Sequence, residues 1–223
     1  MHAFTFPALE QNGEFRSKLG RNRLARDGKS SGKLSSMSHP RPVSWRLHTP
    51  RGHRKYLNPD ERRRFLDAAD RAGPELKAFC HLLAWSGCRL SEALALSVTD
   101  LDPGGSVAIR SLKKRGRTMV REVPVPEAVV TQLGQLPGAS GSLWSWGRTT
   151  AWRHVKNVMA AAGITGLQAS PKGLRHGFGV HAVRSGIPLN LVQRWLGHAD
   201  IATTAIYADV MGAEEREIAA RMW

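Results

Sequence analysis

The chain has 223 residues, enough for one large domain or for one domain with an appendage. It carries 33 Lys and Arg against 18 Asp and Glu, a formal net charge of +15, and this surplus favours a polyanionic partner because each neutralised phosphate releases counterions. Two cysteines exclude a disulfide framework, and the absence of a secretory signal or a ~20-residue apolar run predicts a cytoplasmic protein that does not span a membrane.

Residues 1–52 differ in composition from the rest of the chain. The stretch from 1 to 50 holds nine Lys or Arg against three acids, and it is rich in Ser and Gly without a helical or strand period. We therefore expect a disordered basic arm over 1–52 and one ordered domain over 53–223. An upstream extension without a role is the alternative for the first segment.

The part of the sequence that we expect to be ordered begins with helical segments. Asn58 is a candidate N-cap before Pro59, and the helix that they start runs to about residue 72. A second, largely apolar helix covers Pro74–Ser86, Gly87 ends it, and a third begins around Arg89.

A β-hairpin and further helices complete the predicted domain. Residues 102–105 form a turn, and strands over 107–112 and 119–125 flank a basic turn at 113–116. Helices follow over roughly 126–136, 148–162, 171–185, 188–197, 200–208 and 211–221. The fold class is therefore mainly α with a small β-hairpin (α+β).

A few side chains stand out as candidates for phosphate chemistry. Lys172 and Arg175 lie three apart at a predicted helix start, where the helix end already favours anions. His198 follows a glycine that suits a helix stop, and Tyr207, one of two tyrosines in the chain, ends the next short helix. A single residue of this kind, taken alone, is more often ordinary surface or core structure than a catalytic group.

Four motifs in order resemble the tyrosine recombinase (phage integrase) family. They are GCRLSEAL at 87–94, LRH at 174–176, VQRWLGHAD at 192–200 and TTAIY at 203–207. The resemblance covers 53–223 and implies the catalytic-domain fold of that family. It leaves out 1–52, where family members usually carry a helical domain that clamps DNA.

The resemblance implies metal-independent cleavage and religation of DNA in site-specific recombination. Tyr207 becomes the nucleophile and forms a 3′-phosphotyrosyl bond. Arg89 and Arg175 neutralise the phosphate, since guanidinium pairs bidentately with its oxygens. Lys113 on the hairpin protonates the leaving 5′-oxygen, with Lys114 as its rival.

The remaining site residues are assigned by the same resemblance and by spacing. His198 contacts or orients the scissile phosphate. Lys172 occupies the position where the family most often has histidine, and an ammonium must lose its proton before it can act as a base. Glu92 supports Arg89 from one turn away, and His176 supports the helix start. Basic hairpin residues are expected to contact DNA: Lys114, Arg115 and Arg117.

The implied partners are double-stranded DNA and three further copies of the chain in a homotetramer on paired sites. The tail from 211 to 223 packs into a neighbouring protomer or folds back on its own domain. An accessory protein that replaces the clamp domain is a further possible partner. No cofactor is expected, and no Cys/His cluster has zinc spacing. The protein is expected on nucleoid DNA, in the setting of a mobile genetic element.

Two other functions share these motifs. One is a catalytically impaired DNA-binding module derived from a recombinase. The other is relaxation of supercoiled DNA without strand exchange, in the manner of a type IB topoisomerase. The charge alone also suits a ribosomal or generally adhesive basic protein.

Overall fold

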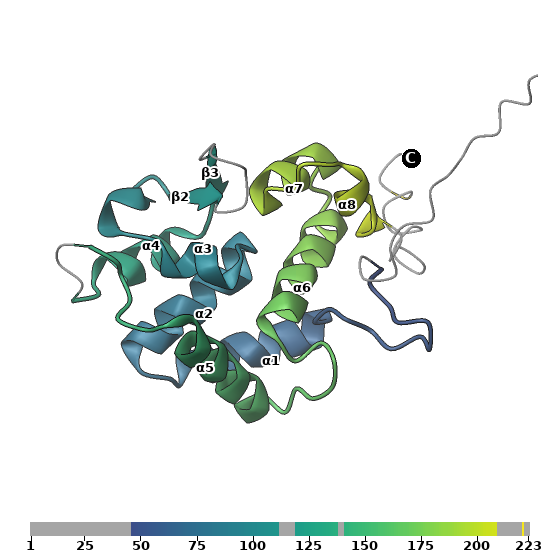
Figure 1. Ribbon diagram of the computed structural model, residues 1–223, viewed down its shortest axis with the longest axis horizontal. Helices are drawn as coiled ribbons and strands as arrows, with labels where there is room; N and C mark the ends of the chain where they lie inside the picture. The colour runs from purple at the N-terminus through teal and green to yellow at the C-terminus, as the bar shows by residue number, and fades with distance from the viewer. Residues whose placement is uncertain (1–45, 112–118, 138–140, 209–219, 221–223) are drawn as a thin grey trace, which may run out of the picture. The chain divides into compact units, whose positions relative to one another are not determined.

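Helices make up most of the part of the chain that the structure describes (Figure 1). The structure is a computed structural model and describes residues 46–111, 119–137, 141–208 and 220. All of these lie within one unit, Pro40–Trp223. None of the helices in these ranges is long and apolar enough to cross a membrane.

Helix α1 (Pro59–Asp70) begins at the predicted cap and α2 (Pro74–Ser86) has the predicted bounds. The Asn58 side chain accepts a hydrogen bond from the Glu61 amide at 2.8 Å, and the Glu61 carboxylate accepts one from the Asn58 amide at 2.9 Å. This reciprocal capping box satisfies two donors that a helix start leaves unpaired. Gly87 ends α2 in the left-handed region at φ 60°, and the short α3 (Leu90–Leu94) follows.

The sheet has three antiparallel strands in the order β1-β2-β3. Both predicted strands are confirmed as β2 (Ser106–Ser111) and β3 (Met119–Pro124), and a short β1 (Leu101–Asp102) was not predicted. β1 directly follows a 3-10 turn (Val98–Asp100) and pairs with the start of β2 across the predicted 102–105 turn. The β2–β3 pairing runs from Ser106↔Pro124 to Ser111↔Met119, so the two strand ends next to residues 112–118 lie side by side.

Five helices follow the sheet in the described ranges. They are α4 (Glu127–Gly134), α5 (Arg148–Ala161), α6 (Pro171–Arg184), α7 (Leu189–Leu196) and α8 (Ala202–Ala205). The last is shorter than the predicted 200–208 because the chain tightens there: the Tyr207 amide donates to the Thr204 carbonyl, three residues back, at 3.0 Å. The helix predicted at 211–221 lies outside the described residues apart from 220.

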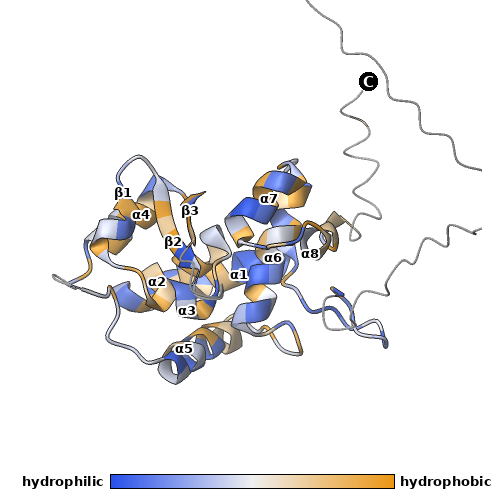
Figure 2. Ribbon diagram, turned by 45° about the horizontal axis from the view of Figure 1, so that its top comes forward, coloured by the Kyte–Doolittle hydropathy of each residue, from blue (hydrophilic) through white to orange (hydrophobic). Residues whose placement is uncertain are grey.

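Two groups of buried apolar side chains hold these elements together. The larger joins α1, α2, α4, α5 and the sheet, and the smaller joins α6, α7 and the segment after α8, with Leu47 packed into it. Figure 1 places α7 and α8 beside α6, and Figure 2 shows that α7 has one apolar and one polar side. Val192 and Leu196 lie on the apolar side and are fully buried. Tyr207 belongs to this smaller group.

Candidate active site

Arg89 is placed by a sharp corner between α2 and α3. Gly87 needs its left-handed conformation there, and a Cβ on it would clash with the Phe178 ring. Arg89 then caps α3: its amide donates to Glu92 at 2.9 Å, and its guanidinium donates to the same carboxylate at 2.6 Å. The Glu92 contact expected from the spacing is therefore present.

Arg175 lies in the first turns of α6 and contacts the backbone of this corner. Its side chain donates to the Gly87 carbonyl at 2.7 Å and to the Leu196 carbonyl at 2.6 Å, and only 9% of the residue is exposed. Burial, and then the charge of Arg89, lower the pKa of Arg175 to about 10. The guanidinium remains charged near neutral pH, so the site has a buried cation fixed by two backbone carbonyls.

A pocket of about 440 Å³ opens over these two arginines. The start of α6 forms one wall, and Ser170 caps that helix by accepting from the Gly173 amide at 3.1 Å. The basic residues that line the pocket come from three helices: Arg89, Arg148, Lys172, Arg175 and His176. Guanidinium and ammonium groups beside a helix N-terminus suit a phosphate group.

Tyr207 packs against this cluster from the segment after α8. Its hydroxyl lies 3.1 Å from His176 Nδ1, and 1% of the residue is exposed. Burial raises its pKa to about 12, against the opposing charges of Arg175 and Arg89. The phenol is therefore protonated near neutral pH, and its contact with His176 is one that the sequence did not predict.

His198 also packs against the tyrosine ring. Gly197 ends α7 in the left-handed region at φ 65°, and this turn directs His198 toward α8, where its Nδ1 lies 2.9 Å from the Thr204 hydroxyl. Its ring stacks on that of Tyr207 with a centroid separation of 6.2 Å. Burial, with the charges of Arg175 and Arg89, lowers its pKa to about 3, so the imidazole is neutral near pH 7.

Arg121 is a buried cation of the site that the sequence analysis missed. From β3 it donates to Glu92 at 2.7 Å and to the Trp195 carbonyl at 2.7 Å, with its side chain 8% exposed. Burial raises the pKa of Glu92, but the hydrogen bonds and charges of Arg121 and Arg89 outweigh it and leave that pKa lowered. Little in the sequence signals this role, because four of the five other residues of β3 are exposed and only Val123 is buried.

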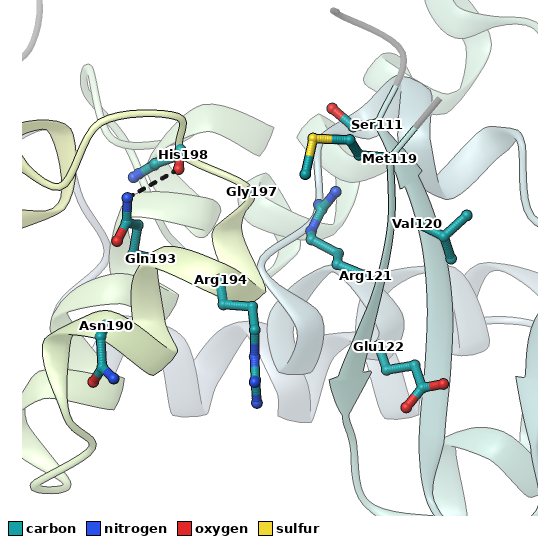
Figure 3. Close-up of a pocket in the computed structure, with 10 residues that line it drawn as sticks. All are labelled: Ser111, Met119, Val120, Arg121, Glu122, Asn190, Gln193, Arg194, Gly197 and His198. Carbon is teal, nitrogen blue, oxygen red and sulfur yellow. Dashed lines mark hydrogen bonds between the residues drawn. The ribbon is translucent and has the colours of Figure 1, made fainter. Parts of the chain in front are cut away.

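A cleft of about 730 Å³ separates β3 from α7 and reaches His198 (Figure 3). Figure 3 shows Arg121 on the β3 side, facing the turn at Gly197 and His198. The Gln193 amide donates to the His198 carbonyl across the top of α7 at 3.3 Å. The strand ends Ser111 and Met119 also line the cleft, so the base of the hairpin adjoins the site.

The structure brings together most of the predicted site residues. Arg89, Glu92, Arg175, His176, His198 and Tyr207 form the cluster described above, and Lys172 lies on the pocket rim as an exposed residue. The hairpin residues lie outside the described residues: Lys113, Lys114, Arg115 and Arg117. Arg148 and Trp152, at the start of α5, are further lining residues that the sequence analysis missed, and Trp152 is an exposed aromatic residue.

Across 46–111, 119–137, 141–208 and 220, no three His, Cys, Asp or Glu side chains are grouped so that they could hold an ion. The cysteines Cys80 and Cys88 are buried and free. Burial raises the pKa of Cys80 to about 12 and that of Cys88 to about 11, so neither thiol is a ready nucleophile.

Several known proteins with similar sequences are tyrosine recombinases. The profile described as "Phage integrase family" matches residues 145–214. Tyrosine recombinase XerD of Caulobacter vibrioides is 36% identical over 191 residues, which cover 76% of this chain and 63% of that protein. Tyrosine recombinase XerC of Rhodospirillum centenum is 35% identical over 149 residues, 60% of this chain and 42% of that protein. The chain thus spans less than two thirds of the length of either relative.

Solved structures agree with this assignment. The crystal structure of XerA recombinase superposes with a TM-score of 0.64 at 28% identity, covering 75% of this chain and 64% of that one. The catalytic domain of bacteriophage HP1 integrase has a TM-score of 0.56 at 24% identity, covers 69% of this chain and 86% of that one, and supports the fold. Sequence and structure together show that this chain carries a catalytic domain of the tyrosine recombinase (phage integrase) family.

Proposed function

We propose that the chain cuts and rejoins double-stranded DNA in site-specific recombination, with Tyr207 as the nucleophile. The observation that carries the proposal is the position of the Tyr207 hydroxyl, 3.1 Å from His176, a residue that lines the same basic pocket as Arg89 and Arg175. The net charge of +15 suits a polyanionic substrate.

The proposed reaction exchanges one phosphoester for another. The Tyr207 oxygen bonds to the scissile phosphorus, the bond from phosphorus to the 5′-oxygen breaks, and the tyrosine keeps the 3′-phosphate until the reverse attack. Arg89 and Arg175 stabilise the negative charge on the five-coordinate phosphorus. Arg175 already donates to two carbonyls, but a guanidinium has five N–H donors and can still reach a phosphate oxygen.

Further groups assist at the edge of the site in this proposal. The leaving 5′-oxygen receives a proton from a hairpin lysine, Lys113 or Lys114. His198 is neutral and its Nδ1 contacts the Thr204 hydroxyl. With Nδ1 as the acceptor of that contact, Nε2–H donates a hydrogen bond to a phosphate oxygen. Lys172, exposed on the pocket rim, serves as a phosphate contact.

The assembly is also part of the proposal. Complete strand exchange needs four copies of the chain on two DNA sites, and it takes place on nucleoid DNA in the cytoplasm. An accessory protein that adds clamping contacts stays a prediction. A recombination assay with and without added cell extract tests for it. A protein factor is supported if the extract increases the yield of recombined DNA, and if protease treatment of the extract, but not nuclease treatment, abolishes that increase.

Trapping the covalent intermediate tests the proposed function. The purified chain is incubated with nicked suicide duplexes whose sequence around the nick is randomised, and protein–DNA adducts are separated on denaturing gels. The chain has two tyrosines, so Tyr56→Phe is the matched control for Tyr207→Phe. We expect an adduct with the unaltered chain and with Tyr56→Phe, and none with Tyr207→Phe.

The other outcomes contradict the proposal. Binding without an adduct on any duplex indicates a DNA-binding module. An adduct together with relaxation of supercoiled plasmid, but without exchange between two sites, indicates a topoisomerase-like activity. An adduct that persists in Tyr207→Phe assigns the chemistry to another residue.

A further inference from the structure

Tyr207 is seated on one face of α6 by two residues three positions apart. Its hydroxyl meets His176, and its ring covers Gly179, where an added Cβ would lie 2.6 to 2.7 Å from three ring atoms. Residues i and i+3 of a helix share a face, so His176 and Gly179 together form a shallow seat for the whole side chain. The sequence has glycine at the position where any larger side chain would lift the ring away.

We propose that His176 is the positioning residue for the nucleophile. Its Nδ1 accepts a hydrogen bond from the Tyr207 hydroxyl and holds the phenol beside the arginines. This inference rests on the proposed function and deepens it. It assigns the placement of the phenol to the residue after Arg175, whereas Lys172 remains on the exposed pocket rim.

Burial and the surrounding charges set the protonation states of the pair. Burial is the largest cause that lowers the pKa of His176. The charges of Lys172 and Arg175 on α6 and of Lys55 before α1 add to it, and the pKa falls to about 4. Arg175 and Arg89 also face Tyr207, whose pKa burial nonetheless raises to about 12. Both groups are thus neutral near pH 7, and a buried phenol O–H needs an acceptor. Among the described residues, His176 Nδ1 is the partner of this hydroxyl.

The same values limit what His176 does. A base with a pKa near 4 cannot remove the proton of a phenol with a pKa near 12 while the site rests without DNA. His176 therefore keeps the tyrosine protonated and in place. The proton passes to a non-bridging phosphate oxygen of the DNA only as the tyrosine oxygen bonds to phosphorus. The neighbouring His198 cannot substitute, because its Nδ1 is engaged with the Thr204 hydroxyl at 2.9 Å.

Two substitutions of His176 separate the acceptor from the rest of the ring. His176→Asn places an amide oxygen near the position of Nδ1, whereas His176→Gln carries its amide to the position of Nε2. His176→Ala removes both. His181→Asn is the matched control, since His181 lies on the same helix and contacts Trp85 instead.

The kinetic test measures the single-turnover rate of adduct formation and, separately, the affinity for uncleaved DNA. We expect Gln and Ala at 176 to slow the adduct about tenfold or more, the effect of one lost hydrogen bond on the barrier. Asn at 176 and the His181 control should stay within about threefold, and DNA affinity should not change in any variant. Equal rates for Asn and Gln, or unchanged rates for all variants, overturn the proposal.

A second readout needs no activity. Nitrogen-15 NMR of the histidine rings in the free protein at pH 7 should show His176 with Nδ1 unprotonated and Nε2 protonated. Tyr207→Phe should shift that Nδ1 resonance, and Tyr56→Phe should leave it in place. A protonated Nδ1, or an Nδ1 resonance that does not shift in Tyr207→Phe, would contradict the proposed hydrogen bond. If the unaltered chain forms no adduct, the proposed function fails while this comparison still decides the inference.

Discussion

Arg121 on strand β3 lies 2.7 Å from Glu92 on helix α3, and both side chains are almost completely buried. The same carboxylate holds Arg89, and the same arginine donates to the Trp195 carbonyl at the end of α7. Glu92 therefore links the phosphate-binding Arg89 of the proposal to β3, the second strand of the hairpin. Arg121 in turn links that strand to the turn before His198.

This link predicts a graded response at Arg121. Arg121→Met leaves a buried carboxylate with one arginine and should lower the free energy of unfolding by about 3 kcal/mol, because breaking a buried pair costs more than the pair contributes. Arg121→Lys should recover stability only in part, since one ammonium cannot copy the forked contacts to Glu92 and Trp195. Urea unfolding measures both. The exposed pair Arg63–Asp60 gives the control, and Arg63→Met should leave stability almost unchanged.

If Arg121→Met unfolds with the free energy of the unaltered chain, the buried link has no structural role. Glu92→Gln gives an independent check, because it keeps the shape of the side chain while removing the charge that Arg89 and Arg121 share. The adduct rate should fall in Glu92→Gln even in conditions where the protein stays folded.

The seat of Tyr207 predicts an unusual effect of a helix-favouring substitution. Gly179→Ala would ordinarily stabilise α6 by up to about 1 kcal/mol, but its Cβ would lie 2.6 to 2.7 Å from the tyrosine ring. We expect lower stability and a slower adduct. Gly134→Ala is the matched control, because nothing lies within 4 Å of an added Cβ there. Thermal unfolding compares the two, and equal shifts in Tm would show that the ring is not seated at Gly179.

The neutral histidines predict a loss of stability in mild acid. The pKa of His176 is lowered to about 4 and that of His198 to about 3, from 6.5 in both cases. The unfolded chain therefore binds more protons below pH 6.5, and the folded state loses stability as the pH falls from 6.5 toward 4. His176→Asn should reduce this slope. Urea unfolding at pH 7.5, 6 and 5 measures it, and a slope that the substitution leaves unchanged would contradict the assignment.

The pocket lining predicts a phosphate contact by Arg148. Arg148 lines the same pocket as Arg89 and Arg175, so Arg148→Gln should weaken DNA binding and reduce the slope of log affinity against log salt by about 0.9. Arg63→Gln, in the exposed pair with Asp60, should leave the slope unchanged. Titrations at several salt concentrations provide the slopes. An unaltered slope for Arg148→Gln would show that Arg148 does not contact a DNA phosphate.

Local patterns predicted most of the helices and both long strands. The cap at Asn58 and the stop at Gly87 mark helix ends that the structure confirms, because capping depends on neighbours a few positions away. The contact of Arg89 with Glu92 follows from their spacing in the same way. The short β1 was missed because two residues carry too little pattern to predict a strand.

Contacts between distant residues were not predictable from these patterns. Arg121 and Glu92 are 29 positions apart, and His176 and Tyr207 are 31 apart. Neither pair shares a helix or a strand, so no period of 2 or 3.6 connects its members. The burial of Tyr207 also depends on a glycine in another helix. The structure was needed to show that the tyrosine and His176 meet.

The most direct measurement is the identity of the residue joined to DNA. The adduct is digested with protease and nuclease, and tandem mass spectrometry locates the nucleotide remnant on the peptide. We predict a 3′-linked nucleotide phosphate on Tyr207 and none on Tyr56, the other tyrosine of the chain. A remnant on any other residue, or linkage through a 5′-phosphate, would contradict the account.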